Sequence, residues 1–275
     1  MFIVMSDWMN NKIEPMTFSN QRVASEFADD TFYFADKESL SNSMLGILDD
    51  SPEKFNLFMQ GKWSYPSADY FDIGTAVHQM FLEDVDNRIK IDGTRRTKAY
   101  KEAKEENPDK LVLPTSDYDL TENMVSKLHK VPQLKEFMGG FAEQRPEVAA
   151  TATVTTSKGN TISVKGKADM LLSDGFGTPV LMDLKTSAKD LNQWKRNAWY
   201  GSYPRQAYLY SNLFEVEEFY FVVITKTFPY DVGIFKASEA FLKKGKEQFE
   251  KSITQYEKLF IEGDFQPYSA VTGTL

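Results

Sequence analysis

Two short stretches with charged residues, each in a β-prone segment, constrain this chain more than any other feature. Gly166-Lys167-Ala168-Asp169 stands within one such segment, and Asp183-Leu184-Lys185-Thr186 closes the next. Residues 173–178 between them are rich in turn-forming types, so the two segments are typical of neighbouring strands in a sheet. Side chains alternate between the two faces of a strand. We therefore expect the two aspartates and Lys185 to meet at one edge of that sheet.

The two acids have chemical consequences if they converge. Carboxylates brought to one point repel each other unless a cation lies between them, and hard divalent cations favour oxygen ligands. Lys185 lies two residues after Asp183 and shares its strand face, so its amine can reach a water bound to such a cation. An ordinary ion pair between Asp183 and Lys185 at a strand end is the alternative interpretation.

The acid-x-lysine spacing alone is common in charged sequences. Glu102-Ala103-Lys104 has the same spacing, but it lies in the polar residues 98–110, which are typical of a solvated helix with charge pairs four residues apart. Asp183-Leu184-Lys185 differs because the apolar residues 179–182 precede it, and unpaired charges at the end of a buried strand are costly. The apolar segment before Asp183, rather than the acid-x-lysine spacing, distinguishes Asp183 and Lys185 from Glu102 and Lys104.

Two residue pairs elsewhere add to the group. Gly74 and His78 lie four residues apart in an apolar segment with helical periodicity, and Gln206 and Tyr210 have the same separation in a helix-like run after the second strand. A lone histidine among apolar side chains is more often a core residue than a metal ligand. The position of His78 in an ordered series of polar residues favours its interpretation as a metal ligand.

In this order the residues resemble the PD-(D/E)XK nuclease superfamily, and within it the RecB-like branch that includes recombination exonucleases of the exodeoxyribonuclease VIII (RecE) type. That branch has a G-x-x-x-H helix, an acid on the first strand, D-x-K on the next strand and Q-x-x-x-Y on the following helix. The resemblance runs from about residue 41 to residue 210, and Ala168 departs from it where the family usually has proline. The matching residues are Gly74, His78, Asp169, Asp183, Lys185, Gln206 and Tyr210, and Glu147 matches an additional acid of the exonuclease type.

The resemblance implies a site for Mg²⁺ or Mn²⁺. Asp169 and Asp183 are the implied carboxylate ligands, the backbone carbonyl of Leu184 completes part of the shell, and His78 is a further ligand. Oxygen-rich sites suit hard divalent cations, and a histidine shifts the preference toward Mn²⁺.

The same resemblance implies roles for the other matching residues. Lys185 is expected to orient or help deprotonate the attacking water and to offset the charge of the transition state. Glu147 is expected to contact a second metal or to position water. Gln206 and Tyr210 are expected to hold Lys185 or a phosphate of the scissile strand.

The activity implied by the resemblance is that of a metal-dependent exonuclease that hydrolyses the phosphodiester bonds of linear double-stranded DNA. It would work in the 5′ to 3′ direction, in recombination or DNA processing. The implied partners are a single-strand annealing protein and, as in ring-forming relatives, further copies of the chain. The alternatives are a PD-(D/E)XK endonuclease or single-strand nuclease, a non-cutting DNA-binding recombination protein of the same fold, and an unrelated α/β protein with accidental matches.

Charge and cysteine content limit these functions. The net charge is −8 and the pI is near 5.0, which argues against coating of nucleic acid through bulk electrostatics. Any contact with DNA must then be local. The chain has no cysteine, so it cannot hold the iron–sulfur cluster of some relatives, because thiolates bind that cluster.

Residues 185–205 are the local exception, with five basic residues and one acid. Lys189, Lys195, Arg196 and Arg205 are expected to contact phosphates there. The aromatic residues interleaved with them either stack on bases or belong to the core of an amphipathic helix. These aromatic residues are Trp194, Trp199 and Tyr200.

The expected fold class is mixed α/β with a restriction-endonuclease-like core, in which helices flank a central mixed sheet. We expect a single nuclease domain over residues 1–275, mostly helical in residues 1–145, with the sheet core and a C-terminal helix in residues 146–275. Residues 1–40 show no clear period, and we assign them no role. Expected helices are residues 43–58, 70–84, 94–106, 120–130, 133–142, 188–200, 203–214 and 241–260, and expected strands are residues 147–156, 161–172, 179–186, 218–226 and 232–235.

The chain shows no sign of a membrane or secretory segment. No apolar run approaches the roughly 20 residues of a membrane span. Residues 1–11 lack the basic and apolar regions of a signal peptide. We therefore expect a cytoplasmic protein of a bacterial cell or a phage-infected host.

Overall fold

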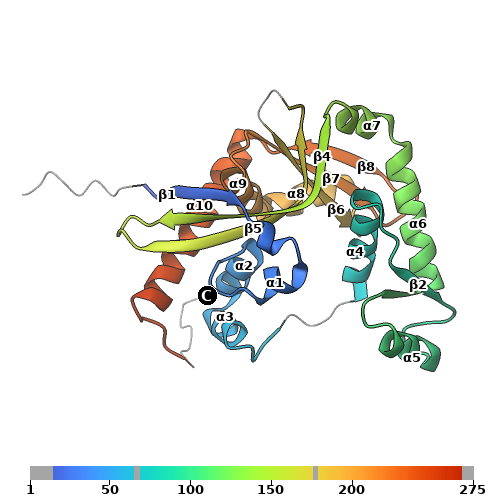
Figure 1. Ribbon diagram of the computed structural model, residues 1–275, viewed down its shortest axis with the longest axis horizontal. Helices are drawn as coiled ribbons and strands as arrows, with labels where there is room; N and C mark the ends of the chain where they lie inside the picture. The colour runs from blue at the N-terminus through green and yellow to red at the C-terminus, as the bar shows by residue number, and fades with distance from the viewer. Residues whose placement is uncertain (1–14, 65–68, 176–178, 268–275) are drawn as a thin grey trace, which may run out of the picture.

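A six-stranded mixed sheet forms the centre of the structure, a computed structural model that describes residues 15–64, 69–175 and 179–267 (Figure 1). The strand order is β1-β4-β5-β6-β7-β8, in which β6 and β7 are parallel and all other neighbours are antiparallel. The strands are β1 (Thr17–Val23), β4 (Glu143–Thr155), β5 (Thr161–Ser173), β6 (Val180–Ser187), β7 (Glu218–Thr225) and β8 (Val232–Lys236). The expected mixed sheet with flanking helices is confirmed.

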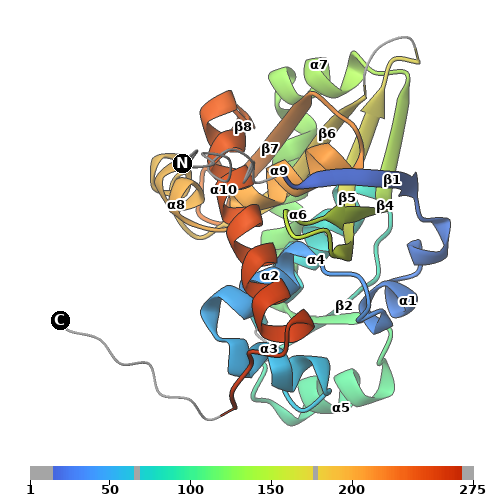
Figure 2. The ribbon, with the colours of Figure 1, turned by 90° about the vertical axis from the view of Figure 1, so that its left-hand side faces the viewer.

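Helices cover both faces of the sheet and enclose two hydrophobic cores. One core lies under α2 (Asn42–Asp50), α9 (Tyr203–Leu213) and α10 (Glu239–Tyr256), and α10 runs along the outside of that layer (Figure 2). The other core lies under α4 (Asp69–Leu82), α6 (Thr115–Lys130) and α7 (Pro132–Gly139). None of the helices in the described ranges has the length and apolar composition needed to cross a membrane.

Strand β6 shows how the sequence builds two cores. Its apolar side chains alternate, so that Leu181 belongs to the first core while Met182 and Leu184 belong to the second. A strand buried on both faces is a near-continuous apolar run, as this one is. Asp183 and Lys185 follow the same alternation and therefore share the face of Leu181, toward α9.

The expected helix over residues 43–58 is two helices, α2 and α3 (Pro52–Met59). Ser51 separates them, and its hydroxyl accepts a hydrogen bond from the backbone N–H of Lys54 at 3.2 Å. Pro52 at the first position of α3 lacks an N–H and cannot continue the preceding helix. The expected C-terminal helix is α10 with a π-helical turn (Glu257–Ile261), and the other expected elements, including α5 (Lys98–Glu106) and α8 (Leu191–Tyr200), are present with bounds shifted by a few residues.

Residues to which the sequence assigned no role form the edge of the sheet. They contribute β1, a 3-10 turn (Ser25–Phe27) and α1 (Asp30–Ala35). β1 escaped prediction because its side chains are mostly exposed or half-exposed and show no apolar alternation. It pairs with β4 and so extends the sheet beyond the β4–β5 hairpin.

A buried lysine of β5 holds α1 against the sheet. The ammonium of Lys165 donates to the backbone carbonyls of Tyr33 (2.5 Å) and Asp36 (2.7 Å) and lies 3.1 Å from the carboxylate of Asp36. Lys165 is 1% exposed, and a buried ammonium is tolerated only with such a set of partners. α1 is thereby fixed beside the strand that carries Asp169.

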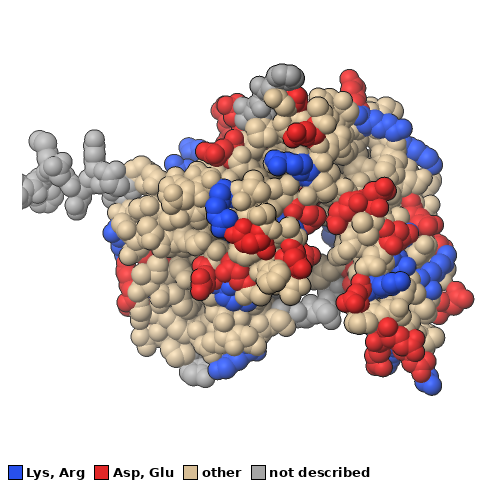
Figure 3. All heavy atoms as spheres, in the orientation of Figure 1, with Lys and Arg blue, Asp and Glu red and all other residues tan. Residues whose placement is uncertain are grey.

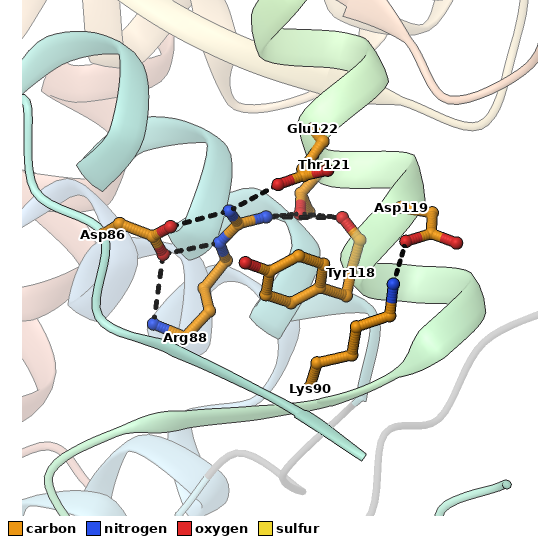
Figure 4. A network of polar contacts seen from close by, with 7 residues as sticks. All are labelled: Asp86, Arg88, Lys90, Tyr118, Asp119, Thr121 and Glu122. Atoms are coloured by element: carbon orange, nitrogen blue, oxygen red, sulfur yellow. Dashed lines mark hydrogen bonds and ion pairs between the residues drawn. The ribbon is translucent and has the colours of Figure 1, made fainter. Parts of the chain in front are cut away.

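β2 (Arg88–Ile91) and β3 (Leu111–Pro114) form a separate parallel pair that the sequence did not predict, because each strand has only four residues. Arg88 fastens this pair to α6 (Figure 4). Its guanidinium donates to Asp86 (2.7 Å) and to the hydroxyl of Thr121 (2.6 Å), and it lies 4.0 Å from the ring centroid of Tyr118. Arg88 therefore joins the small sheet to α6.

Helices α9 and α10 approach each other so closely that the contact requires a glycine. A Cβ on Gly245 would lie 2.0 Å from the backbone oxygen of Pro204 and 2.8 Å from the Cβ of Tyr208. Because the first of these atoms belongs to the backbone, α9 itself would have to shift. The contact fixes the position of α9, the helix that carries Gln206.

We predict that Gly245→Ala lowers the free energy of unfolding by about 1–3 kcal/mol, the usual cost of overpacking. Gly139→Ala is the matched control, because Gly139 ends α7 and no neighbouring atom lies within 4 Å of its Cβ position. Its stability should be unchanged or slightly higher, since alanine favours a helix over glycine. Urea denaturation followed by circular dichroism measures both variants. Equal midpoints would contradict the close contact.

Candidate metal centre

Three acidic residues form a row across neighbouring strands. The β5–β6 ladder pairs Met170 with Met182 and stops there, so Asp169 and Asp183 occupy the next opposed position, where the strands diverge. In the β4–β5 ladder, Glu147 stands opposite Asp169, with regular pairs on either side. The two aspartates thus reach one edge of the paired region, and Glu147 stands next to them on the third strand.

Glu147 has an unusual backbone conformation. Its φ is 52°, in the left-handed region that residues other than glycine rarely adopt. This conformation costs on the order of 1 kcal/mol or more and is found where the surrounding structure enforces it, often at functional sites. β4 begins at Glu143, earlier than the expected residue 147, so Glu147 interrupts the pairing of an established strand rather than starting one.

His78 connects α4 to the end of the β5–β6 ladder. Its Nε2 lies 2.7 Å from the carbonyl oxygen of Leu184, which can only accept a hydrogen bond. Nε2 therefore carries the proton, and Nδ1 of the neutral ring keeps a free lone pair. Nδ1 lies 3.5 Å from Oδ2 of Asp169, and the same Oδ2 accepts a hydrogen bond from the backbone N–H of Leu184 at 2.8 Å. Three elements thus meet around the Asp169 carboxylate.

One nitrogen and two carboxylates make up a group of potential metal ligands. One ligand atom each of His78, Glu147 and Asp169 lies within 4.8 Å of the other two. With the tautomer described above, all three atoms are acceptors, so they cannot satisfy one another without an added proton or cation. Two carboxylate oxygens and an imidazole nitrogen suit Mg²⁺ or Mn²⁺. These residues fit the divalent cation that the resemblance implied.

Asp183 pairs with Lys185, as in the alternative interpretation of the sequence, and with Gln206. Its carboxylate is buried, with Oδ1 accepting a hydrogen bond from the amide of Gln206 (2.6 Å) and Oδ2 lying 2.6 Å from Nζ of Lys185. Lys185 and Asp183 thus form a close ion pair. Glu147 rather than Asp183 joins His78 and Asp169 in the ligand group. Oδ2 of Asp183 keeps acceptor capacity beside it.

A cavity of about 290 Å³ opens onto this group. Its wall comes from α1, α4 and β4, and the molecule is visibly hollowed between α1 and α4, with acidic side chains around the hollow (Figure 3). An anionic phosphodiester would be repelled by this wall unless a cation were bound. The lining residues include Asp30, Phe71, His78, Gln79, Glu83 and Glu147.

Lys167 belongs to the same site, although no role was expected for it. Its ammonium lies 2.6 Å from Asp30 of α1 and 3.4 Å from Glu147. The sequence contained a signal for it, because a residue two positions before Asp169 shares the same strand face. Lys167 thus links the position of α1 to that of a potential metal ligand.

Arg205 was expected to contact DNA, and this prediction is wrong. Its guanidinium donates to Asn42 (2.8 Å) and Ser252 (3.0 Å) and pairs with Asp49. Arg205 is 2% exposed and cannot reach a phosphate on the surface. A count of basic residues along the sequence does not reveal that α9 buries this face between α2 and α10.

The remaining predicted residues divide between surface and core. Lys189, Lys195 and Arg196 are exposed on α8 or just before it, where they remain available for phosphate contacts. Tyr210 is buried, and Gly166 leaves room for it, since a Cβ there would lie 2.6 Å from the Tyr210 ring. Of the aromatic residues of α8, Trp194 is in the core while Trp199 and Tyr200 are exposed.

Known proteins show the same fold. Residues 41–271 match the model of a family described as a PDDEXK-like domain of unknown function (DUF3799). The chain belongs to this family. This confirms the superfamily and the restriction-endonuclease-like fold that the sequence predicted.

Solved structures resemble this PDDEXK-like domain to different degrees. A structure from Eubacterium rectale, described as a putative exonuclease, has a TM-score of 0.62 at 15% sequence identity over 92% of this chain and 96% of that chain. The structure of SSO0001 has a TM-score of 0.32 at 17% identity over 74% of this chain and 97% of that chain, which is too low to support a common fold. None of the curated proteins matches the sequence significantly.

Burial and mutual repulsion raise the pKa values of two acids in this PDDEXK-like domain. Burial, reinforced by the charge of Asp169, raises the pKa of Glu147 from the ordinary 4.5 to about 7. The same two causes raise the pKa of Asp183. Burial lowers the pKa of Lys185, but the charges of Asp183 and Asp169 outweigh it and hold that pKa above its usual value. Lys185 is therefore a cation at neutral pH.

We predict that the affinity for Mn²⁺ rises by on the order of tenfold between about pH 5.5 and pH 8, because the metal must displace the proton of Glu147. The rise should level off above the Glu147 pKa of about 7. The stability of the metal-free protein should instead fall as the pH rises. A carboxyl with a raised pKa binds more protons in the folded state, so its contribution to the free energy of unfolding falls as pH rises from 4.5 to about 7.

Isothermal titration calorimetry with Mn²⁺ and thermal unfolding in EDTA measure these two trends. Glu147→Gln should weaken Mn²⁺ binding and remove most of its pH dependence. Glu102→Gln, an exposed glutamate on α5, should leave both unchanged. An affinity that does not vary with pH, or wild-type binding by Glu147→Gln, would contradict the assignment of Glu147 to the ligand group.

Proposed function

We propose that this PDDEXK-like domain is a metal-dependent deoxyribonuclease that acts as an exonuclease on linear double-stranded DNA. The family and the fold support a nuclease-like function. The row of Glu147, Asp169 and Asp183 beside His78 and Lys185 carries the proposal. Packing alone does not account for this row, because gathering buried acids opposes folding unless a cation or proton offsets them.

The chain's own residues prepare the site for hydrolysis. A divalent cation bound by His78, Glu147 and Asp169 would polarise a phosphoryl oxygen and lower the pKa of a bound water. The carbonyl of Leu184 keeps His78 in the tautomer that leaves Nδ1 free as a ligand. The backbone N–H of Leu184 fixes the orientation of the Asp169 carboxylate.

Lys185 supplies the positive charge that phosphodiester hydrolysis requires. Negative charge grows on the phosphoryl oxygens as water adds to phosphorus and the P–O bond to the leaving group breaks. An ammonium held beside Asp183 offsets that charge without rearrangement. Because Lys185 stays protonated at neutral pH, orienting water and compensating charge suit it better than acting as a base. Gln206 is a positioning residue, since its amide holds the other oxygen of Asp183.

The finer description of the substrate rests on the sequence resemblance to recombination exonucleases. That resemblance supports duplex ends as substrate, the 5′ to 3′ direction, a homo-oligomer and a single-strand annealing partner. The Eubacterium rectale protein described as a putative exonuclease adds support for the exonuclease. An endonuclease or a single-strand nuclease with the same site is the second candidate.

We predict that Asp183→Ala and Lys185→Ala each slow Mn²⁺-dependent degradation of linear duplex DNA by about 10²- to 10⁴-fold, because each removes the charge pair beside the scissile phosphate. Lys104→Ala is the matched control, since it removes the lysine of the exposed Glu102-Ala103-Lys104 segment on α5 and should cut at the wild-type rate. Gel assays measure degradation, and circular dichroism checks the fold. Wild-type rates in both site variants would rule the site out.

Linear, nicked and closed circular forms of one plasmid separate the candidate activities. The exonuclease should degrade the linear form and leave the closed circle intact, and EDTA should stop it. Release of a 5′ label before a 3′ label would establish the direction. Opening of the closed circle would favour the endonuclease. Metal-dependent DNA binding without cleavage would favour the non-cutting DNA-binding protein.

A further inference from the structure

A second cavity, of about 350 Å³, lies outside the metal centre, between α8, β8 and the first turn of α10. Five of its eleven lining residues are aromatic. Trp194 stacks on Phe235 with ring centroids 5.5 Å apart and planes inclined by 16°, and Trp199 lies 5.9 Å from Phe241. Flat rings on several sides favour a flat ligand.

Trp194 lines this cavity and carries a buried hydrogen-bond donor. The residue is 6% exposed, and its indole Nε1 has no acceptor in the part of the chain that the structure describes. Buried indole N–H groups normally have a partner, because an unpaired donor opposes folding. The rings of Tyr203 (5.6 Å) and Phe221 (5.7 Å) pack on its other sides. A flat ligand with an acceptor atom in its ring plane would pair with this donor by turning the Trp194 ring toward the cavity.

Two lysines place positive charge beside the same cavity. Nζ of Lys195 lies 5.8 Å from the ring centroid of Phe235, and Nζ of Lys244 lies 4.9 Å from that of Trp199 and 5.0 Å from that of Tyr200. Among the described residues, neither ammonium has a carboxylate within ion-pair distance, whereas the wall residue Lys236 is paired with Glu218. On a chain of net charge −8, this local excess favours an anionic ligand.

We propose that this cavity binds a nucleobase, with its phosphate held by the two lysines. We call the site formed by Trp194, Lys195, Trp199, Phe235 and Lys244 the base pocket. A nucleobase is flat, carries ring-plane acceptors for the Trp194 N–H, and brings a phosphate within a few bonds. An apolar peptide side chain would leave both the donor and the ammonium groups without partners.

The base pocket lies one aromatic ring away from the metal centre. The Tyr203 ring centroid is 5.6 Å from that of Trp194 and 5.8 Å from Nζ of Lys185. Tyr203 thus packs against a residue of each site. A base of a single DNA strand and a free mononucleotide would offer the pocket the same chemistry. Binding in the pocket does not require cleavage, so it can be measured without it.

The test is binding of a fluorescein-labelled oligothymidylate of about ten nucleotides to the full chain in EDTA, by fluorescence anisotropy. Trp194→Phe removes the N–H, keeps an aromatic ring and should weaken binding by about tenfold. Lys195→Ala/Lys244→Ala should weaken it at least as much and reduce the salt dependence by about two phosphate contacts. Lys251→Ala, which removes an exposed lysine of α10 outside the pocket, should bind like the wild type.

Competition with deoxyadenosine monophosphate distinguishes the two sources of the ligand. Displacement of the oligonucleotide shows that a single nucleotide fills the pocket, and binding without displacement shows that contacts to a longer strand are needed; both support the pocket. Unchanged affinity in the pocket variants, or no binding of either probe by the wild type, overturns it. The double lysine variant changes the exposed Lys195 and the half-buried Lys244, outside the hydrophobic core, and remains informative if Trp194→Phe is poorly folded. Because EDTA prevents cleavage, loss of this binding and loss of nuclease activity are separate results.

Discussion

The gathering of negative charge where β5 and β6 separate is the constraint on which the rest of the structure depends. Asp169, Asp183 and Glu147 stand in one row, each partly or wholly removed from water. Desolvation and repulsion both oppose their ionisation, so each acid needs a donor or a cation from elsewhere. The chain provides these from three elements: the Leu184 N–H and Lys185 from β6, Lys167 from β5, and Gln206 from α9.

The need to hold those elements in place accounts for structure that has no chemical role of its own. Gln206 can reach Asp183 only if α9 keeps its position, and the close contact at Gly245 fixes it from outside. Arg205, the preceding residue, points the other way and ties α9 to α2 and α10 through Asp49 and other partners. Consecutive residues of one helix thus anchor the helix and orient an acid of the site.

The sequence predicted the fold, and it also pointed to most residues of the candidate site, because both depend on local patterns. Apolar runs broken by turns gave the strands of the core, and the ordered polar residues gave the acids and Lys185. The position of Glu147 also follows from the register of the hairpin. Once Thr155 stands opposite Thr161, Glu147 stands opposite Asp169. The resemblance identifies Glu147 as an additional acid but does not place it beside Asp169 and His78.

The features that the sequence did not predict depend on contacts between distant segments. β1 and the β2–β3 pair have weak patterns and are fixed by what they pack against. The burial of Arg205 follows from three helices meeting, and no count of charges along the chain contains that information. The same limit applies to Trp194, whose aromatic neighbours come from β7, β8 and α9.

The distribution of charge gives the two proposed sites different relations to DNA. Around the cavity at the metal centre the exposed groups are largely acidic, so a phosphate gains by approaching only after a cation has reduced that repulsion. Around the base pocket the unpaired charges are lysines on α8 and α10, which attract a strand whether or not a metal is present. Tyr203 lies between the two sites and touches the surroundings of both. DNA binding at the basic side should therefore be independent of metal, whereas approach of a phosphate to the acidic side should require it.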